Sequence, residues 1–254
     1  MSQFGHRGVQ FFLESASPAK RFKRFLEYLP KIVTFRTHRI NGYLFRSHLI
    51  KSYLESHEVT KLHIGAAANI LDGWLNTDLK PRSKKVVFLD VEESFPTKSC
   101  TFDYVYSEHV VEHLPYNVCR FMLQESYRIL RPEGRIRIAT PDLERLIGLL
   151  SPKRDDLQEH YIRWIIDRFL PYRADAYRPS IVINNAFQNW GHRFIYDSGT
   201  LRDILAEAGF VDIVKFAPGE SNDDMLKGIE NHGSTVNNEE MNRFETMVLE
   251  ARRP

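Results

Sequence analysis

The sequence has only two cysteines, Cys100 and Cys119, and they form no C-x-x-C pair. This excludes a disulfide framework and the common cysteine zinc sites, and it favours a reducing compartment. Nowhere are there about 18 consecutive apolar residues, so no membrane-spanning helix is predicted. The first ten residues also lack an apolar run followed by a cleavage site. We therefore expect a soluble, cytoplasmic protein.

The sequence also lacks a large excess of positive or negative charge, because 35 Lys and Arg residues are balanced by 33 Asp and Glu residues. The resulting net charge of +2 argues against nucleic acid as a partner. We find no internal repeat and no low-complexity tract. A chain of 254 residues with 43% hydrophobic content fits one α/β domain with appendages.

One region departs from this charge balance. Residues 17–50 have helical spacing and a single acid, Glu27, against a group of basic side chains. The basic residues are Lys20, Arg21, Lys23, Arg24, Lys31, Arg36, Arg39 and Arg46. A helical extension with solvated charges accounts for them, and the alternative is a peripheral contact with an anionic membrane.

From residue 61 onward, strand-like and helix-like segments alternate. Strands are predicted over residues 61–64, 70–78, 85–91, 100–106, 135–140, 209–216 and 244–250, and helices over 47–56, 116–130 and 198–208. Residues 142–186 read as helical and aromatic, whereas residues 231–242 read as a polar loop. Polar groups follow three strands, at Asp78, Asp90 and Ser107-Glu108, and in a parallel sheet such strand ends share one edge.

The glycine-rich loop of dinucleotide-binding proteins is missing. After the first strand the chain has one glycine, Gly65, and three alanines instead of G-x-G-x-x-G. Gly65 allows a sharp turn that leaves room for a ligand, and Asp78 at the next strand end can accept both hydrogen bonds of a ribose diol. This favours a cofactor that has a ribose but no pyrophosphate, such as S-adenosylmethionine. An ordinary strand-turn-strand remains the alternative.

Four stretches carry a resemblance to a known family. They are Leu62 to Gly65 with Gly73 to Asp78, Ser99 to Leu114, Arg128 to Gly134, and Gly191 to Asp197 with Ala208-Gly209-Phe210. In this order they resemble class I S-adenosylmethionine-dependent methyltransferases, and most of all the compact bacterial group linked to cell-envelope sugar and polysaccharide pathways. The resemblance covers roughly residues 61–250.

The resemblance implies a Rossmann-like seven-stranded α/β sheet, mostly parallel, with an antiparallel last strand. A helical extension over residues 1–58 would precede a methyltransferase domain over residues 59–254, and residues 142–197 would form a helical substrate cap. The implied cofactor is S-adenosylmethionine. The implied reaction is methyl transfer, and the expectation is O-methylation of a small-molecule acceptor or of a sugar or polysaccharide precursor.

By the same resemblance, Gly65 and Ala66 would line the methionine part of the cofactor. Asp78 would hold the ribose hydroxyls, and Asp90 with the backbone of Val91 would read the adenine edge. These residues would spread the cofactor across three neighbouring strand ends.

Ser107 and Glu108 would lie beside the sulfonium. The chain departs from the family at Ala67, where a second glycine is usual, and at Glu133, where a glycine is usual. If Ala67 needs a positive φ, its side chain adds about 1 kcal/mol or more of strain.

Two histidines are candidates for the general base that removes a proton from an acceptor hydroxyl, His109 first and His192 second. His109 follows the Ser107-Glu108 strand end, and His192 lies in a loop expected to fold back over the site. Histidine suits this task because its pKa lies near neutrality. A structural histidine that bonds to backbone is the alternative for each.

The segment from His109 to His113 also matches H-x-x-E-H, the inverted zinc-protease signature. That signature needs an uninterrupted helix, whereas here a predicted strand ends just before it and Pro115 follows it. We therefore predict no metal site. A non-catalytic protein that binds the cofactor or a partner is a further alternative.

Aromatic side chains between residues 142 and 196 are candidates for stacking on the face of a sugar. They are Tyr161, Trp164, Tyr172, Tyr177, Phe187 and Trp190. At helical spacing, such residues also suit a hydrophobic core.

Overall fold

The structure is a computed structural model that describes residues 44–170 and 177–254. Most of the predicted basic helical region, up to residue 43, lies outside the described residues. A helix over residues 44–56 opens the described part, in agreement with the predicted 47–56. None of the helices in these two ranges combines the length and apolarity that a membrane span requires.

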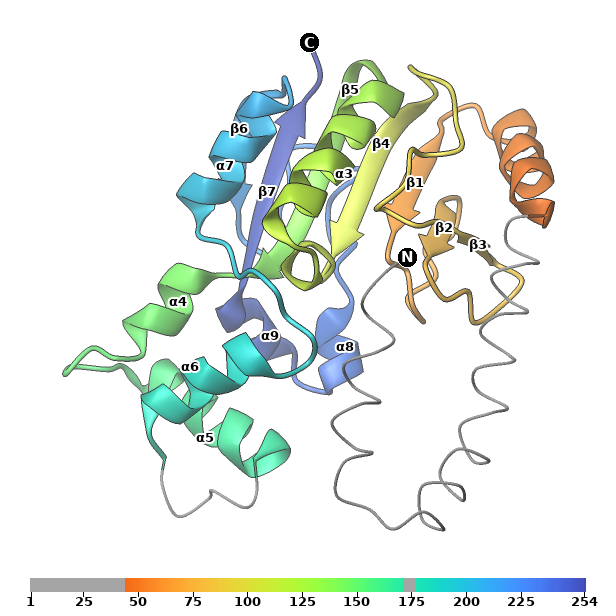
Figure 1. Ribbon diagram of the computed structural model, residues 1–254. Coiled ribbons are helices and arrows are strands. Elements are labelled where there is room, and N and C mark those ends of the chain that lie inside the picture. Colours follow the sequence, from red (N-terminus) through yellow and green to blue (C-terminus); the bar gives the residue numbers. More distant parts are fainter. Residues whose placement is uncertain (1–43, 171–176) are drawn as a thin grey trace, which may run out of the picture.

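A seven-stranded sheet forms the centre of the molecule (Figure 1). Its strands are β1 (Lys61–Ile64), β2 (Leu75–Asp78), β3 (Val86–Phe88), β4 (Phe102–Glu108), β5 (Leu130–Pro141), β6 (Val211–Phe216) and β7 (Thr246–Arg252). They lie in the order β3-β2-β1-β4-β5-β7-β6. Strand β7 is antiparallel to β5 and β6, whereas the pairs from β3 to β5 are parallel. The predicted Rossmann-like sheet with an antiparallel last strand is confirmed.

The strand order reverses between β1 and β4, because the chain first adds β2 and β3 on one side and then continues on the other. At such a point the loops that leave adjacent strands diverge, and a crevice opens beyond their carboxyl ends. The sheet therefore provides a ligand site at the ends of β1 and β4.

The two faces of the sheet are covered differently. On one face, apolar residues such as Ile64, Val105 and Ile138 form the main core together with α3 (Tyr116–Ile129) and α7 (Ser198–Glu207). On the other face, Trp74 and Tyr106 pack with Leu226, which belongs to the connection after β6. Since alternate residues of a strand point to opposite faces, each strand contributes to both layers.

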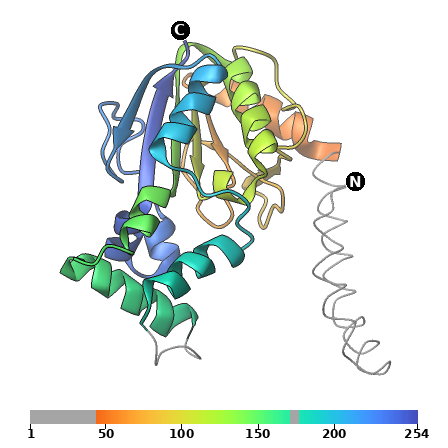
Figure 2. The ribbon, with the colours of Figure 1, turned by 60° about the vertical axis from the view of Figure 1, so that its left-hand side comes forward.

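A group of helices lies beyond the carboxyl ends of the parallel strands (Figures 1 and 2). It contains α4 (Leu143–Gly148), α5 (Asp156–Phe169), α6 (Pro179–Gln188) and α9 (Glu239–Glu245). Their buried side chains, among them Tyr161, Ile165 and Phe244, form a second hydrophobic cluster. A capping box of Asp155 and Gln158 fixes the start of α5. These helices cover the crevice at the strand ends.

Several predicted elements have other bounds in the structure. Strand β2 begins at Leu75 and not at residue 70, and β7 begins at Thr246 and not at residue 244, because α9 extends to Glu245. Strand β5 begins at Leu130, not at Arg135, because residues 131–134 bulge out of register opposite Phe102 and Tyr104. A Cβ on Gly134 would lie 2.8 Å from the carbonyl oxygen of Arg131, so this bulge requires glycine.

The predicted polar loop over residues 231–242 is wrong. It contains α8 (His232–Val236) and the start of α9 (Glu239–Glu245). Asn238 caps α9 by accepting a hydrogen bond from the backbone N–H of Met241, and the Met241 side chain is fully buried. A cap and few apolar contacts thus suffice to form short helices in a polar stretch.

Candidate active site

A cavity of about 360 Å³ lies at the predicted crevice. Its sheet side is lined by residues 65–69 after β1 and by Glu108 and His109 at the end of β4. Its helix side is lined by residues that include Tyr161, Trp164 and His192. This volume falls within the range of about 300–1,000 Å³ that small-molecule pockets have.

The loop after β1, which lines one side of the cavity, depends on Gly65. Its φ is 77°, and a Cβ at this position would lie 2.1 Å from Cγ2 of Val110. The backbone N–H groups of Gly65 and Ala66 both donate to the carbonyl oxygen of Thr77, at 2.9 and 2.8 Å. Glycine is required here both by the turn and by the close approach of Val110.

Ala67 has a φ of 44°, so the strain considered from the sequence is present, at about 1 kcal/mol. Its backbone N–H donates to Oδ2 of Asp78 at 3.0 Å, and Oδ1 of Asp78 accepts from the N–H of Lys80 at 2.6 Å. Asp78 therefore fastens the loop after β1 to the end of β2. Each carboxylate oxygen can accept more than one hydrogen bond, so these contacts leave capacity for a ligand.

Ser107 and Glu108 point in different directions. Ser107 is fully buried on the same side of β4 as Val105 and does not line the cavity. Glu108 lines the cavity, and its carboxylate accepts from the backbone N–H groups of Asn231 and His232. Burial raises the pKa of Glu108, although these two hydrogen bonds oppose the shift. Glu108 thereby ties the start of α8 to the sheet.

His109 lines the cavity and has a left-handed backbone conformation, with a φ of 50°. Its Nδ1 donates to Oε1 of the fully buried Glu112 at 3.0 Å. Burial alone would lower the pKa of His109, but the hydrogen bond and the charge of Glu112 outweigh burial and raise it. For Glu112 burial acts upward, and the hydrogen bond and charge of His109 outweigh it and lower the pKa to about 2.

His192 lines the cavity from the loop after α6. Its Nδ1 lies 2.7 Å from the carbonyl oxygen of Ala186, so Nδ1–H donates and Nε2 carries the lone pair. Burial lowers the pKa of His192 and keeps the imidazole neutral. The His113 ring packs edge-on against it, with 5.0 Å between the ring centroids.

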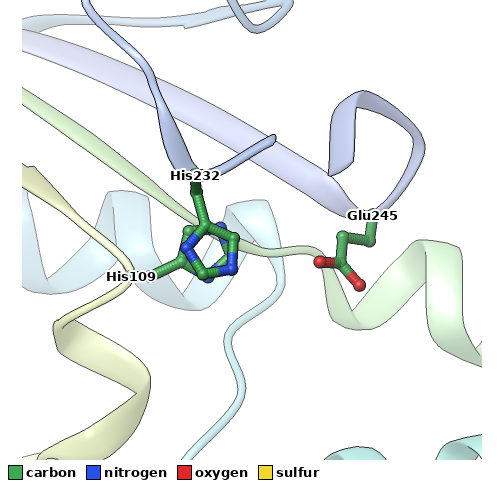
Figure 3. A group of neighbouring side chains, drawn as sticks. All are labelled: His109, His232 and Glu245. Carbon is green, nitrogen blue, oxygen red and sulfur yellow. The ribbon is translucent and has the colours of Figure 1, made fainter. Parts of the chain in front are cut away.

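Two residues of this site were missed by the sequence predictions, His232 and Glu245. The His232 ring stacks on His109 with 3.8 Å between centroids, and Glu245 turns its carboxylate toward both rings (Figure 3). Burial, helped by the nearby His109, lowers the pKa of His232 to about 4. Burial raises the pKa of Glu245. No sequence spacing links these residues, because they meet only through the folding of α8 and α9.

The helix side of the cavity is aromatic. Tyr161, Trp164 and Trp190 line it, together with Phe169, whose ring contacts both tryptophans. Of the other aromatic candidates, Tyr177 and Phe187 are exposed and do not line the cavity, and Tyr172 lies outside the described residues.

Three of the predicted cofactor residues lie beside the cavity and not in its lining. Asp78 ends β2, which is next to β1, and Asp90 and Val91 follow β3, one strand further out. They lie along the edge formed by the carboxyl ends of the strands, on the side of Gly65 that leads toward β3.

The H-x-x-E-H signature does not form the long helix that a zinc protease requires. His109 precedes a single 3-10 turn, η2 (Val111–His113), and only Glu112 and His113 lie within it. The two histidines consequently face different neighbours, His232 for His109 and His192 for His113.

Comparison with known proteins gives a match to one protein family. Residues 34–214 match the model of the methyltransferase domain family. Among curated proteins, no relative matches the chain.

Several solved structures are similar in fold at low sequence identity. An S-adenosylmethionine-dependent methyltransferase from Archaeoglobus fulgidus is 17% identical, with 89% of this chain and 99% of that chain covered and a TM-score of 0.44. One from Thermotoga maritima is 17% identical, with 92% and 98% covered and a TM-score of 0.42. One from Mesorhizobium loti is 15% identical, with 77% and 91% covered and a TM-score of 0.45.

The family match spans well over half of the chain, and it agrees with the resemblance that the motifs carry. The prediction of an enzyme is confirmed, and the non-catalytic alternative is not supported. The protein belongs to the methyltransferase domain family and is a methyltransferase.

Proposed function

We propose that this enzyme transfers a methyl group from S-adenosylmethionine to a hydroxyl group of a small-molecule or sugar acceptor. The observation that carries the proposal is the cavity itself, which joins the loop after β1 to an aromatic wall and has histidines between them. An aromatic wall suits the apolar face of a sugar ring. A precursor of a cell-envelope polysaccharide is the acceptor class that the sequence resemblance favours.

The residues present fit the cofactor. The turn at Gly65 requires glycine, because its φ is positive and a Cβ there would collide with Val110. Gly65 and Ala66 would hold the methionine part, and Asp78 would accept hydrogen bonds from the ribose hydroxyls. Asp90 and the backbone of Val91, one strand further, would bind the adenine edge. Glu108 would lie near the sulfonium, whereas the buried Ser107 would support the strand end from behind.

S-adenosylmethionine, when bound, supplies a methyl group that its sulfonium activates. The chain then has two tasks, which are to align the acceptor oxygen and to take its proton. Tyr161, Trp164 and Trp190 would orient the acceptor. His192 is well arranged as the base, because its Nδ1–H is held by Ala186 and its neutral Nε2 can receive the proton. His109 is the second candidate for this role.

Calorimetric titration with S-adenosylmethionine, S-adenosylhomocysteine and NAD tests the binding step. We expect both sulfur compounds to bind and NAD not to bind. Asp78→Ala should weaken binding by more than about tenfold, since it removes the acceptor for the ribose hydroxyls. Asp72→Ala, in the exposed turn before β2, is the matched control and should bind as the wild type does. Equal binding by both variants would contradict the assignment of Asp78.

A turnover assay with a panel of sugars and other hydroxyl compounds tests the chemical step. His192→Asn should lower kcat by roughly 10²–10⁴-fold while the affinity for S-adenosylmethionine stays unchanged. An unchanged kcat in His192→Asn, with a loss in His109→Asn, would transfer the base role to His109.

A further inference from the structure

Three side chains from separate parts of the chain meet in the lining of the cavity. His109 follows β4, His232 opens α8 and Glu245 ends α9. One nitrogen of each imidazole and one oxygen of the carboxylate lie within 4.8 Å of one another. Figure 3 shows the two rings stacked and the Glu245 carboxylate directed toward them. Two imidazoles and a carboxylate are a common set of metal ligands in proteins.

His109 provides the observation that points to a ligand. Its side chain is only 10% exposed, and its Nε2 is buried without a hydrogen-bond partner among the described residues. Its Nδ1 is held by the carboxylate of Glu112. A carboxylate on one ring nitrogen and an open lone pair on the other is the usual arrangement of a metal-binding histidine.

Glu245 is oriented in a comparable way. The hydroxyl of Tyr161 donates to Oε2 of Glu245, which leaves Oε1 for another bond. The His232 backbone is fixed by Glu108, whose carboxylate accepts from its N–H at 2.9 Å. The His109 ring, the Glu245 carboxylate and the His232 backbone are thus each held by a hydrogen bond beside a shared space.

We propose that His109, His232 and Glu245 bind one divalent transition-metal ion of the zinc class. With bonds of about 2.0–2.1 Å, tetrahedral ligand atoms lie roughly 3.3 Å apart, so the stacked His109 and His232 rings must rotate apart before each can point a nitrogen at the same ion. Two nitrogens and one oxygen suit zinc and its neighbours better than magnesium, which prefers oxygen ligands. Three protein ligands leave a coordination position that faces the cavity, where an acceptor oxygen could bind.

A second group, formed by Glu112, His113 and His192, has similar spacing but is a poorer donor set. The two Glu112 oxygens already accept hydrogen bonds from His109 and from the hydroxyl of Thr140. Nδ1 of His192 is held by Ala186. In the second group, Glu112 therefore orients neighbouring side chains and His192 is left for proton transfer. The proposed ion and the proposed base thus use different histidines.

The test is metal binding by the full chain after chelator treatment, measured by calorimetry with Zn²⁺ and by the visible absorption of Co²⁺. We expect one ion per chain, weak binding of Mg²⁺, and cobalt bands typical of nitrogen and oxygen ligands. His232→Asn and Glu245→Gln should each weaken zinc binding by more than about tenfold. Glu112→Gln should weaken it by about 10–100-fold, because His109 loses its orienting carboxylate.

His160→Asn is the matched control, since His160 on α5 is exposed, contacts Glu240 and does not line the cavity. It should bind zinc as the wild type does, and circular dichroism should show that each variant is folded. The proposal is overturned if the wild type binds no zinc, or if His232→Asn and Glu245→Gln bind it normally. Cobalt bands with thiolate character would also overturn it. Because the titration contains neither S-adenosylmethionine nor an acceptor, its outcome is independent of the proposed reaction.

Discussion

At the scale of single residues, some residues that line the cavity have positive φ angles, which glycine or asparagine would adopt more easily. Ala67 and His109 have φ angles of 44° and 50°, and both border the cavity. Strain of this kind persists where surrounding contacts fix the backbone, and it gathers at functional sites. In this chain, the Ala67 N–H is fixed by Asp78 and the His109 ring by Glu112.

Replacement of Ala67 by glycine should relieve this strain. We expect Ala67→Gly to raise the free energy of unfolding by up to about 1 kcal/mol, because glycine has no Cβ to oppose a positive φ. The neighbouring Ala68→Gly is the control, since Ala68 has no positive φ. It should lower stability by about 0.4–1 kcal/mol through greater freedom of the unfolded chain. Urea denaturation measures both effects, and equal changes in the two variants would contradict the explanation.

His63 should make stability depend on pH. Its side chain is buried, its Nδ1 lies 3.0 Å from Oδ1 of Asn76, and burial lowers its pKa to about 4. Between pH 6.5 and 4 the unfolded chain binds this proton and the folded chain does not, so stability falls as the pH decreases. The loss amounts to about 3 kcal/mol once the pH is below 4.

Denaturation at pH 7.5, 5.5 and 4.5 checks this, with His63→Phe as the comparison because phenylalanine cannot titrate and can still pack against Tyr106. The difference in stability between wild type and variant should change with pH in that window. A constant difference would refute the prediction.

At the scale of elements, one buried arginine connects the sheet to the segment that leads into α8. Nε of Arg137 on β5 donates to Glu230 at 2.5 Å, and its NH1 group donates to the carbonyl oxygen of Glu220 at 2.8 Å and to Glu250 on β7. Glu230 also accepts from the N–H of Gly219 at 3.0 Å. This network fixes both ends of residues 219–230.

Arg137→Met should therefore destabilise the protein by about 3–5 kcal/mol, because Glu230 and Glu250 remain buried without a cation. The matched control is Arg120→Met, which breaks an exposed ion pair with Glu207 and should cost within about 1 kcal/mol. Thermal and chemical unfolding measure both variants. Similar losses in the two would show that the buried network contributes no more than a surface pair.

Most of the strands and helices could be predicted from the sequence, and the exceptions have physical causes. Strands were predictable because each is a short apolar run bounded by glycine, proline or acids, as for Lys61–Ile64. The beginning of β5 was not, because the bulge at residues 131–134 is stabilised by contacts with distant residues. His109 and His192 were found through their places after a strand and in a loop. His232 and Glu245 were not, because their positions depend on the packing of short helices that a polar sequence does not indicate.

At the scale of the whole molecule, cofactor binding should stabilise the fold. A ligand that binds only the folded state adds about 2.7 kcal/mol at a concentration of 100 times its Kd. For a domain of this size that corresponds to an increase in Tm of roughly 5–11 °C. Differential scanning calorimetry with S-adenosylhomocysteine should show this increase, and NAD at the same concentration should leave the Tm unchanged. An unchanged Tm with both compounds would contradict cofactor binding by the folded chain.

The order of the strands also affects how the chain is assembled during synthesis. Strand β6 pairs with β7 alone, and β7 lies between β5 and β6. The ribosome makes β6 before β7, so while about 30 further residues are synthesised β6 lacks the strand with which it pairs. During that time its backbone hydrogen-bonding groups are exposed, as at any unprotected sheet edge. The residues between β6 and β7 include Glu230 and His232. The proposed metal site and the pairing of β6 with β7 are therefore completed in the same late step of folding.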